Sequence, residues 1–112
     1  MEITLESLQA WAHRVDKEKG WWEGERPIPE CLALIHSEVS EALEEYRDPV
    51  RPLSETHLNL EFKPEGFPIE LADIVIRVAD LADHLGISLS AAVIEKMRYN
   101  ETRPYRHGGK LA

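Results

Sequence analysis

Apolar residues recur every three or four positions through four stretches of this 112-residue chain, and this spacing constrains the fold more than any other feature. Thr4, near the start of the first stretch, and Ser88, before the fourth, are candidate N-cap residues, and Gly86 ends the third stretch. Four helices with few credible strands predict an all-α four-helix bundle, built as a single domain over residues 1–112. The predicted helices cover residues 3–19, 28–47, 67–85 and 89–103.

Two parts of the chain fall outside this pattern. Residues 48–66 form a long connection with three prolines, in which "HLNLEF" is either a short strand or turn, or mobile. Residues 104–112 form a basic tail that contains glycine.

The helix over residues 67–85 is apolar around more than half of its circumference, because Ile76 and Ala79 lie away from its main stripe. This surplus predicts homo-oligomerisation.

Composition and charge exclude several classes of partner. The formal net charge is -8 and the isoelectric point is near 5.1, so a nucleic acid polymer or an anionic membrane is not an expected partner. No run approaches the length of a membrane span, and the acidic N-terminus lacks the features of a signal peptide. The single Cys31 is expected to be a buried structural thiol. Together these features predict a cytoplasmic protein.

Two pairs of carboxylates flank the apolar stripes of the second and third predicted helices. Glu38 and Glu41 are three residues apart and share a flank with Glu45, while Glu70 and Asp73 repeat the spacing. If the stripes pack together, four carboxylates converge and need a cation, and hard oxygen ligands select Mg²⁺ or Mn²⁺. The alternative is a solvated acidic surface. A di-iron site is disfavoured, because it needs Glu-x-x-His pairs.

Cations on the fourth predicted helix complement these acids. Lys96, Asn100 and Arg103 share one face, and Lys110 follows beside two glycines in the tail. Such donors next to a metal–carboxylate site suit a polyphosphate, although a solvated helix with a frayed tail has the same composition. The loop before the second helix carries Trp21 and Trp22. Each is a candidate to stack on a nucleobase, or to close the bundle end or an oligomer interface.

The ordered set of motifs resembles the MazG-type all-α nucleoside triphosphate pyrophosphohydrolases, over residues 28–110. The family carries E-x-x-E, E-x-x-D and K-x-x-x-N-x-x-R on successive helices. The resemblance implies Mg²⁺-dependent hydrolysis of a nucleoside or deoxynucleoside triphosphate to the monophosphate and pyrophosphate, and assembly as dimers or tetramers. It implies Glu38, Glu41, Glu70 and Asp73 as metal ligands, and Lys96, Asn100 and Arg103 as phosphate ligands.

One departure from the family pattern affects catalysis. Many relatives carry a further acidic residue that serves as general base, and Ser37 stands at that position here. Three alternatives follow. A metal-bound hydroxide attacks without a separate base, Glu45 or His36 serves as the base, or the protein binds Mg²⁺ and nucleotide without cleaving the nucleotide. A third hypothesis is a helical oligomer whose carboxylates are surface charge.

Overall fold

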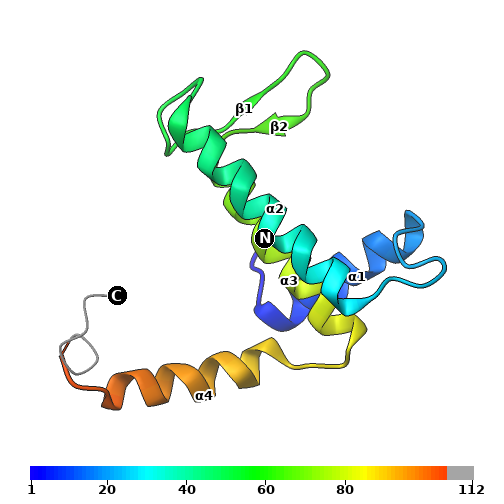
Figure 1. Ribbon diagram of the computed structural model, residues 1–112, viewed down its shortest axis with the longest axis vertical. Coiled ribbons are helices and arrows are strands. Elements are labelled where there is room, and N and C mark those ends of the chain that lie inside the picture. The colour runs from blue at the N-terminus through cyan, green and yellow to red at the C-terminus, as the bar shows by residue number, and fades with distance from the viewer. Residues whose placement is uncertain (106–112) are drawn as a thin grey trace.

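The helix α3 (Phe67–His84) is the central element of the fold, and α1 (Leu5–Glu18) and α2 (Ile28–Arg47) both pack against it (Figure 1). The computed structural model describes residues 1–105. A short hairpin of β1 (His57–Leu58) and β2 (Pro64–Glu65) precedes α3, and α4 (Leu89–Thr102) follows it. The prediction of an all-α protein is confirmed. Within the described part of the chain, no helix has both the length and the apolar character needed to cross a bilayer.

The helix boundaries follow from local capping chemistry. At α1 the Thr4 hydroxyl accepts a hydrogen bond from the Ser7 backbone N–H, and the Ser7 hydroxyl accepts one from the Thr4 N–H. The Ser88 hydroxyl caps α4 by accepting from the Ala91 N–H. Gly86 follows α3 with φ at +70°, in the left-handed region that favours glycine. Both predicted N-caps and the predicted end of α3 are therefore confirmed.

Small residues form the buried core where α1 and α2 meet α3. Among the described residues no large side chain is fully buried, and Ala79 has no exposed surface at all. The interpretation of Ala79 as surplus surface was therefore wrong: α3 is covered on two sides, and a methyl group there lets the helices approach closely. Cys31 is buried, as the sequence predicted, and this burial raises the pKa of its thiol. The buried apolar residues are Ala12, Cys31, Ala42, Ala79 and Ala82.

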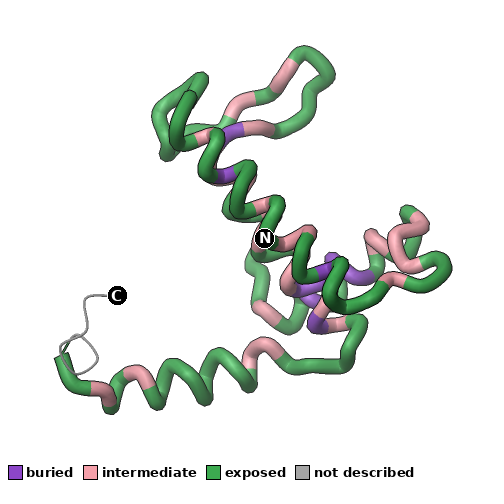
Figure 2. The backbone as a smooth tube through the Cα atoms, in the orientation of Figure 1, coloured by how far each residue is buried: buried purple, intermediate pink, exposed green. Residues whose placement is uncertain are grey.

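The fourth helix does not join the others in a bundle. It projects away from α2 and α3 (Figure 1), and most of its length is exposed (Figure 2). Its start is fixed to α1, because the Gln9 amide donates to the Ile87 carbonyl at 2.7 Å and its oxygen accepts from the Leu89 N–H at 2.9 Å. The chain is therefore three packed helices and one projecting helix, where the sequence predicted a four-helix bundle.

The connection at residues 48–66 contains the short strand that was one of its two predicted forms. His57 pairs with Glu65 and Leu58 with Pro64 in antiparallel register. Asn59 closes the turn, since its side-chain oxygen accepts from two backbone N–H groups of residues 61 and 63. The hairpin lies beyond the C-terminal end of α2 and leads the chain directly into α3.

Candidate metal centre

Three carboxylates from two helices meet at the α2–α3 contact. Glu38 of α2 and Glu70 and Asp73 of α3 each offer an oxygen atom, and these three atoms lie within 4.8 Å of one another. All three side chains are half-buried. Adjacent ligands of an octahedral Mg²⁺ ion are about 2.9 Å apart and opposite ligands about 4.2 Å, so the three side chains would have to move closer together to bind one ion directly. The donor set is all oxygen, which fits Mg²⁺ or Mn²⁺.

The electrostatics of the group show negative charge that nearby cations compensate only in part. Burial raises the pKa of Glu70, and the charges of Asp73 and Glu38 raise it further. Burial and Glu38 also raise the pKa of Asp73, against the opposing effect of Arg77 and Lys63. Carboxylates with raised pKa values are destabilised in their ionised form, so a cation bound among them relieves a penalty already present in the fold.

Arg77 is a cation beside this group that the sequence analysis did not identify. Its Nε donates to Glu38 Oε1 at 2.6 Å, and its guanidinium lies 4.9 Å from the centre of the Trp21 ring. Arg77 follows Asp73 by four residues on α3, which places both on one face of the helix. That spacing is the sequence signal that would have revealed it.

A small cavity of about 250 Å³ opens beside the carboxylates, and Asp16 of α1 is also at its wall. Burial raises the pKa of Asp16 to about 6, and a hydrogen bond with Asp80 adds to the effect. Asp80 is itself buried and accepts hydrogen bonds from His13 at 2.8 Å and from the Trp22 indole at 2.9 Å. The cavity is lined by Asp16, Trp21, Glu38, Asp73, Ile76 and Arg77.

The other predicted acidic and aromatic residues take different positions. Glu41 is exposed and is not a member of the three-carboxylate group, although its charge and that of Glu45 contribute to the raised pKa of Glu70. Trp22 stacks on His84 with ring centroids 3.7 Å apart and so closes one end of the helix packing. Trp21 lines the cavity beside the carboxylates.

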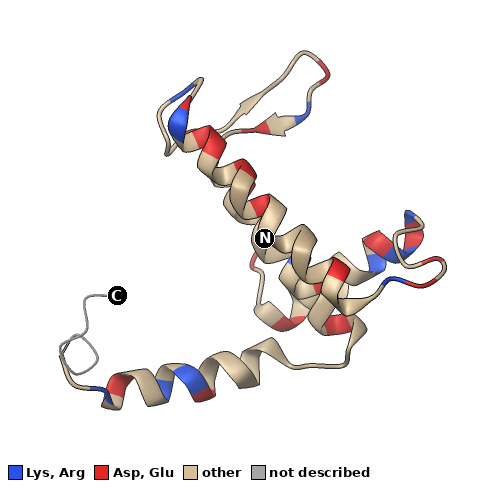
Figure 3. Ribbon diagram, in the orientation of Figure 1, with Lys and Arg blue, Asp and Glu red and all other residues tan. Residues whose placement is uncertain are grey.

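The predicted phosphate ligands do not meet the carboxylates within this chain. Lys96 and Asn100 lie on α4 and Arg103 follows its last residue. The helix projects away from α2 and α3, and Figure 3 shows its basic residues separated from the acidic residues of α2. Lys110 lies outside the described residues. The structure thus assembles the acidic half of the predicted site and leaves its basic half on a separate surface.

Comparison with family models, curated proteins and solved structures gives no match for this chain.

A metal-binding centre of this kind is expected to make the stability of the protein depend on Mg²⁺. At pH 7.5 a Mg²⁺ concentration of 100 times Kd adds about 2.7 kcal/mol to the free energy of unfolding. The measurement is the melting temperature with MgCl₂ or with KCl at equal ionic strength, since KCl reproduces only general screening. Protonation of Glu70 and Asp73 competes with the metal, so the effect should shrink as the pH falls toward 4.5. Equal melting temperatures in the two salts at pH 7.5 would contradict the assignment.

Proposed function

We propose that this chain is a Mg²⁺-dependent hydrolase that cleaves a nucleoside or deoxynucleoside triphosphate to the monophosphate and pyrophosphate. The observation that carries this proposal is the convergence of Glu38, Glu70 and Asp73 within 4.8 Å, beside a cavity that also contains an arginine. Bare carboxylates repel a polyphosphate, but carboxylates that hold a divalent cation attract it. The order of the motifs along the sequence supports the same reaction.

Each residue at the centre has a role in this proposal. Glu38, Glu70 and Asp73 hold the ion, with Glu41 and Glu45 as outer carboxylates on the same helix flank. Bound Mg²⁺ neutralises phosphate charge and lowers the pKa of water. The Arg77 guanidinium is placed to contact a phosphate oxygen, in the planar geometry that such oxygens prefer.

The mechanism needs a group that accepts a proton from the attacking water. The Ser37 hydroxyl donates to the Leu34 carbonyl at 2.7 Å, so it is engaged with its own helix. Asp16 lines the cavity beside Glu38 and Asp73 without belonging to the three-carboxylate group, and it is therefore our candidate to accept the proton of an attacking water. Trp21 lines the same cavity and remains our candidate to stack on the nucleobase.

The position of Ser37 also favours a second candidate function. A protein that holds Mg²⁺ and a nucleotide without cleaving it needs the three carboxylates but no general base. For either function the partner is a small nucleotide, and the single free Cys31 is consistent with our placing the protein in the reducing cytoplasm.

A panel of nucleoside and deoxynucleoside triphosphates distinguishes the two candidates. With Mg²⁺, the hydrolase releases pyrophosphate and the monophosphate in equal amounts from at least one of them, and excess EDTA stops the release. Orthophosphate as the first product would indicate a different bond cleavage and would contradict the proposal. Nucleotide binding by calorimetry without any pyrophosphate after long incubation would select the binding protein.

A further inference from the structure

The chain exposes more surface than a folded monomer of its mass. Its accessible surface is 8796 Å², whereas about 6300 Å² is expected for a compact protein of this size. Its radius of gyration is 16.6 Å, against about 13 Å expected for this length. The excess of about 2500 Å² is large compared with the roughly 1000 Å² that each chain buries in a small stable homodimer. A second molecule covering part of this surface is therefore the simplest way to complete the fold.

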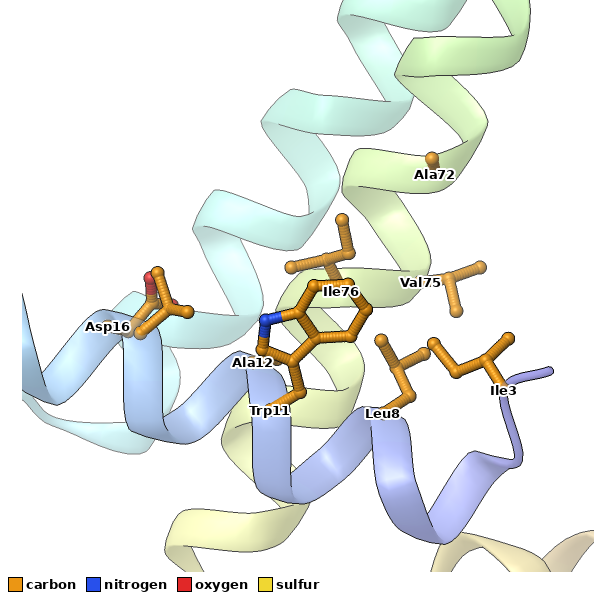
Figure 4. A pocket seen from close by; sticks show the side chains of 9 residues that line it. Ile3, Leu8, Trp11, Ala12, Asp16, Ala72, Val75 and Ile76 are labelled. Atoms are coloured by element: carbon orange, nitrogen blue, oxygen red, sulfur yellow. The ribbon is translucent and has the colours of Figure 1, made fainter. Parts of the chain in front are cut away.

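One part of the excess is an apolar groove between α1 and α3, with a volume of about 620 Å³ (Figure 4). Trp11 is 44% exposed and Val75 is 47% exposed, which is unusual for large apolar side chains that face one another across two helices. Asp16 is the charged residue among those lining the groove, and it also lines the cavity of the metal centre. The groove is lined by Ile3, Leu8, Trp11, Ala12, Val15, Asp16, Ala72, Val75 and Ile76.

Another part of the excess is the projecting helix α4. Leu89, Val93 and Met97 follow one another at four-residue spacing and form an apolar stripe, of which Val93 is 43% and Met97 is 52% exposed. Lys96 lies on one flank of this stripe, about 60° from its centre on a helical wheel, and Arg103 follows directly after the last residue of α4. A surface that receives the stripe therefore also has Lys96 at its edge.

We propose that α4 of a second copy of this chain occupies the groove between α1 and α3, and that the exchange is reciprocal. The proposal joins the apolar groove of one chain to the apolar stripe of the other. The charges agree as well, because Asp16 and Asp73 lie beside the groove and the flank of α4 is basic. A chain cannot readily use its own α4, since Gln9 holds the start of that helix in its projecting direction.

The exchange also supplies what the metal centre lacks within one chain. Lys96, Asn100 and Arg103 of the second copy would stand beside Glu38, Glu70 and Asp73 of the first, so that each site is built from two chains. This part of the inference rests on the proposed hydrolase function. The docking of α4 into the groove does not rest on that function, because it follows from the apolar groove of one chain and the apolar stripe on α4 of the other.

The first test is the molar mass of the purified protein by light scattering after gel filtration. The expected mass is a multiple of 12.8 kDa, with the dimer as the smallest stable unit. Met97→Asp should shift the protein to the monomer while its far-ultraviolet circular dichroism still shows helix. Leu60→Asp is the matched control, since Leu60 is fully exposed on the hairpin and lies in neither surface. A monomeric wild type, or an oligomer equally insensitive to both changes, would overturn the proposal.

A cross-link identifies which surfaces meet. In a Cys31→Ser background, Val75→Cys and Met97→Cys are prepared as two separate proteins, mixed, and oxidised with oxidised glutathione. A disulfide between the two proteins at twice the chain mass is expected. Leu60→Cys mixed with Val75→Cys should give little of it. Placing Val75→Cys and Met97→Cys in one chain tests the alternative: an intrachain disulfide in a monomer would show that α4 covers its own groove, and would overturn the proposal.

Mixing two inactive proteins tests whether the site is shared. Glu70→Gln removes an acid, and the double variant Lys96→Ala, Arg103→Ala removes the cations, so each protein alone should be inactive. Random pairing of a 1:1 mixture gives one intact site in each mixed dimer, or about a quarter of the wild-type activity. No recovery, in dimers that exchange chains, would show that α4 serves its own chain. If no triphosphate is cleaved by the wild type, the proposed function fails, while the mass and the cross-link still decide the docking.

Discussion

Glu70→Gln is expected to lower pyrophosphate release at least a hundredfold and, without metal, to raise the melting temperature. The loss of activity follows because a metal ligand contributes several kcal/mol of charge stabilisation in the transition state, and each 1.36 kcal/mol is about a tenfold change in rate. The gain in stability follows because burial and the neighbouring carboxylates raise the pKa of Glu70, which means that its surroundings destabilise the ionised carboxylate. Few explanations other than a metal site predict both signs for one neutralising substitution.

The pH dependence of this gain is fixed by the direction of the pKa shift. Because the folded protein binds the Glu70 proton more tightly than the unfolded chain, wild-type stability increases as the pH falls through the folded pKa. The advantage of Glu70→Gln in metal-free buffer should therefore be present at pH 7.5 and disappear near pH 4.

Glu44→Gln is the matched control for this substitution. Glu44 is exposed and pairs with Arg47 at the surface, so its loss should change activity and melting temperature little. A Glu70→Gln protein that cleaves its substrate at the wild-type rate, or that melts lower than the wild type without metal, would remove Glu70 from the site.

The parts of this protein that could be predicted from sequence are those that depend on local chemistry. Thr4 and Ser88 cap helices through hydrogen bonds to residues three positions away, and that information is contained in a few adjacent letters. The convergence of Glu38 with Glu70 and Asp73 could be predicted because each lies beside an apolar stripe, and two stripes that pack against each other bring their flanks together.

The parts that could not be predicted depend on which faces of the helices are covered. Glu41 is only three residues from Glu38, yet it is exposed. Its position on the helix flank could not predict this, because the flank does not show how far the contact between α2 and α3 extends. The spacing of Arg77 from Asp73 indicates that both share a face of α3, but it does not show that Arg77 reaches Glu38 on the partner helix. The direction of α4 is set by the Gln9 side chain across 78 residues of sequence, a contact that no local pattern encodes.

Gly66→Ala is expected to have the largest effect on stability among single substitutions outside the metal centre. Gly66 is buried directly before α3, with φ at +123° and ψ at +166°, a region of backbone conformation that is essentially restricted to glycine. A Cβ atom there would lie 2.8 Å from the Glu55 carbonyl oxygen, which belongs to the backbone and cannot rotate away. The strain and the contact together should lower the free energy of unfolding by about 3 kcal/mol or more.

The same substitution connects the hairpin to the metal centre. The Gly66 carbonyl accepts hydrogen bonds from the backbone N–H groups of Ile69 and Glu70, so a shift at Gly66 moves the first turn of α3 and a candidate metal ligand with it. Gly24→Ala is the matched control: its φ is +74°, but no atom lies within 4 Å of the position that the alanine methyl group would take, so only the conformational cost of about 1–2 kcal/mol applies. Melting curves of both variants, with and without Mg²⁺, should show a lower melting temperature and a smaller Mg²⁺ effect for Gly66→Ala. Equal curves for the two variants would show that the Glu55 contact yields without moving α3.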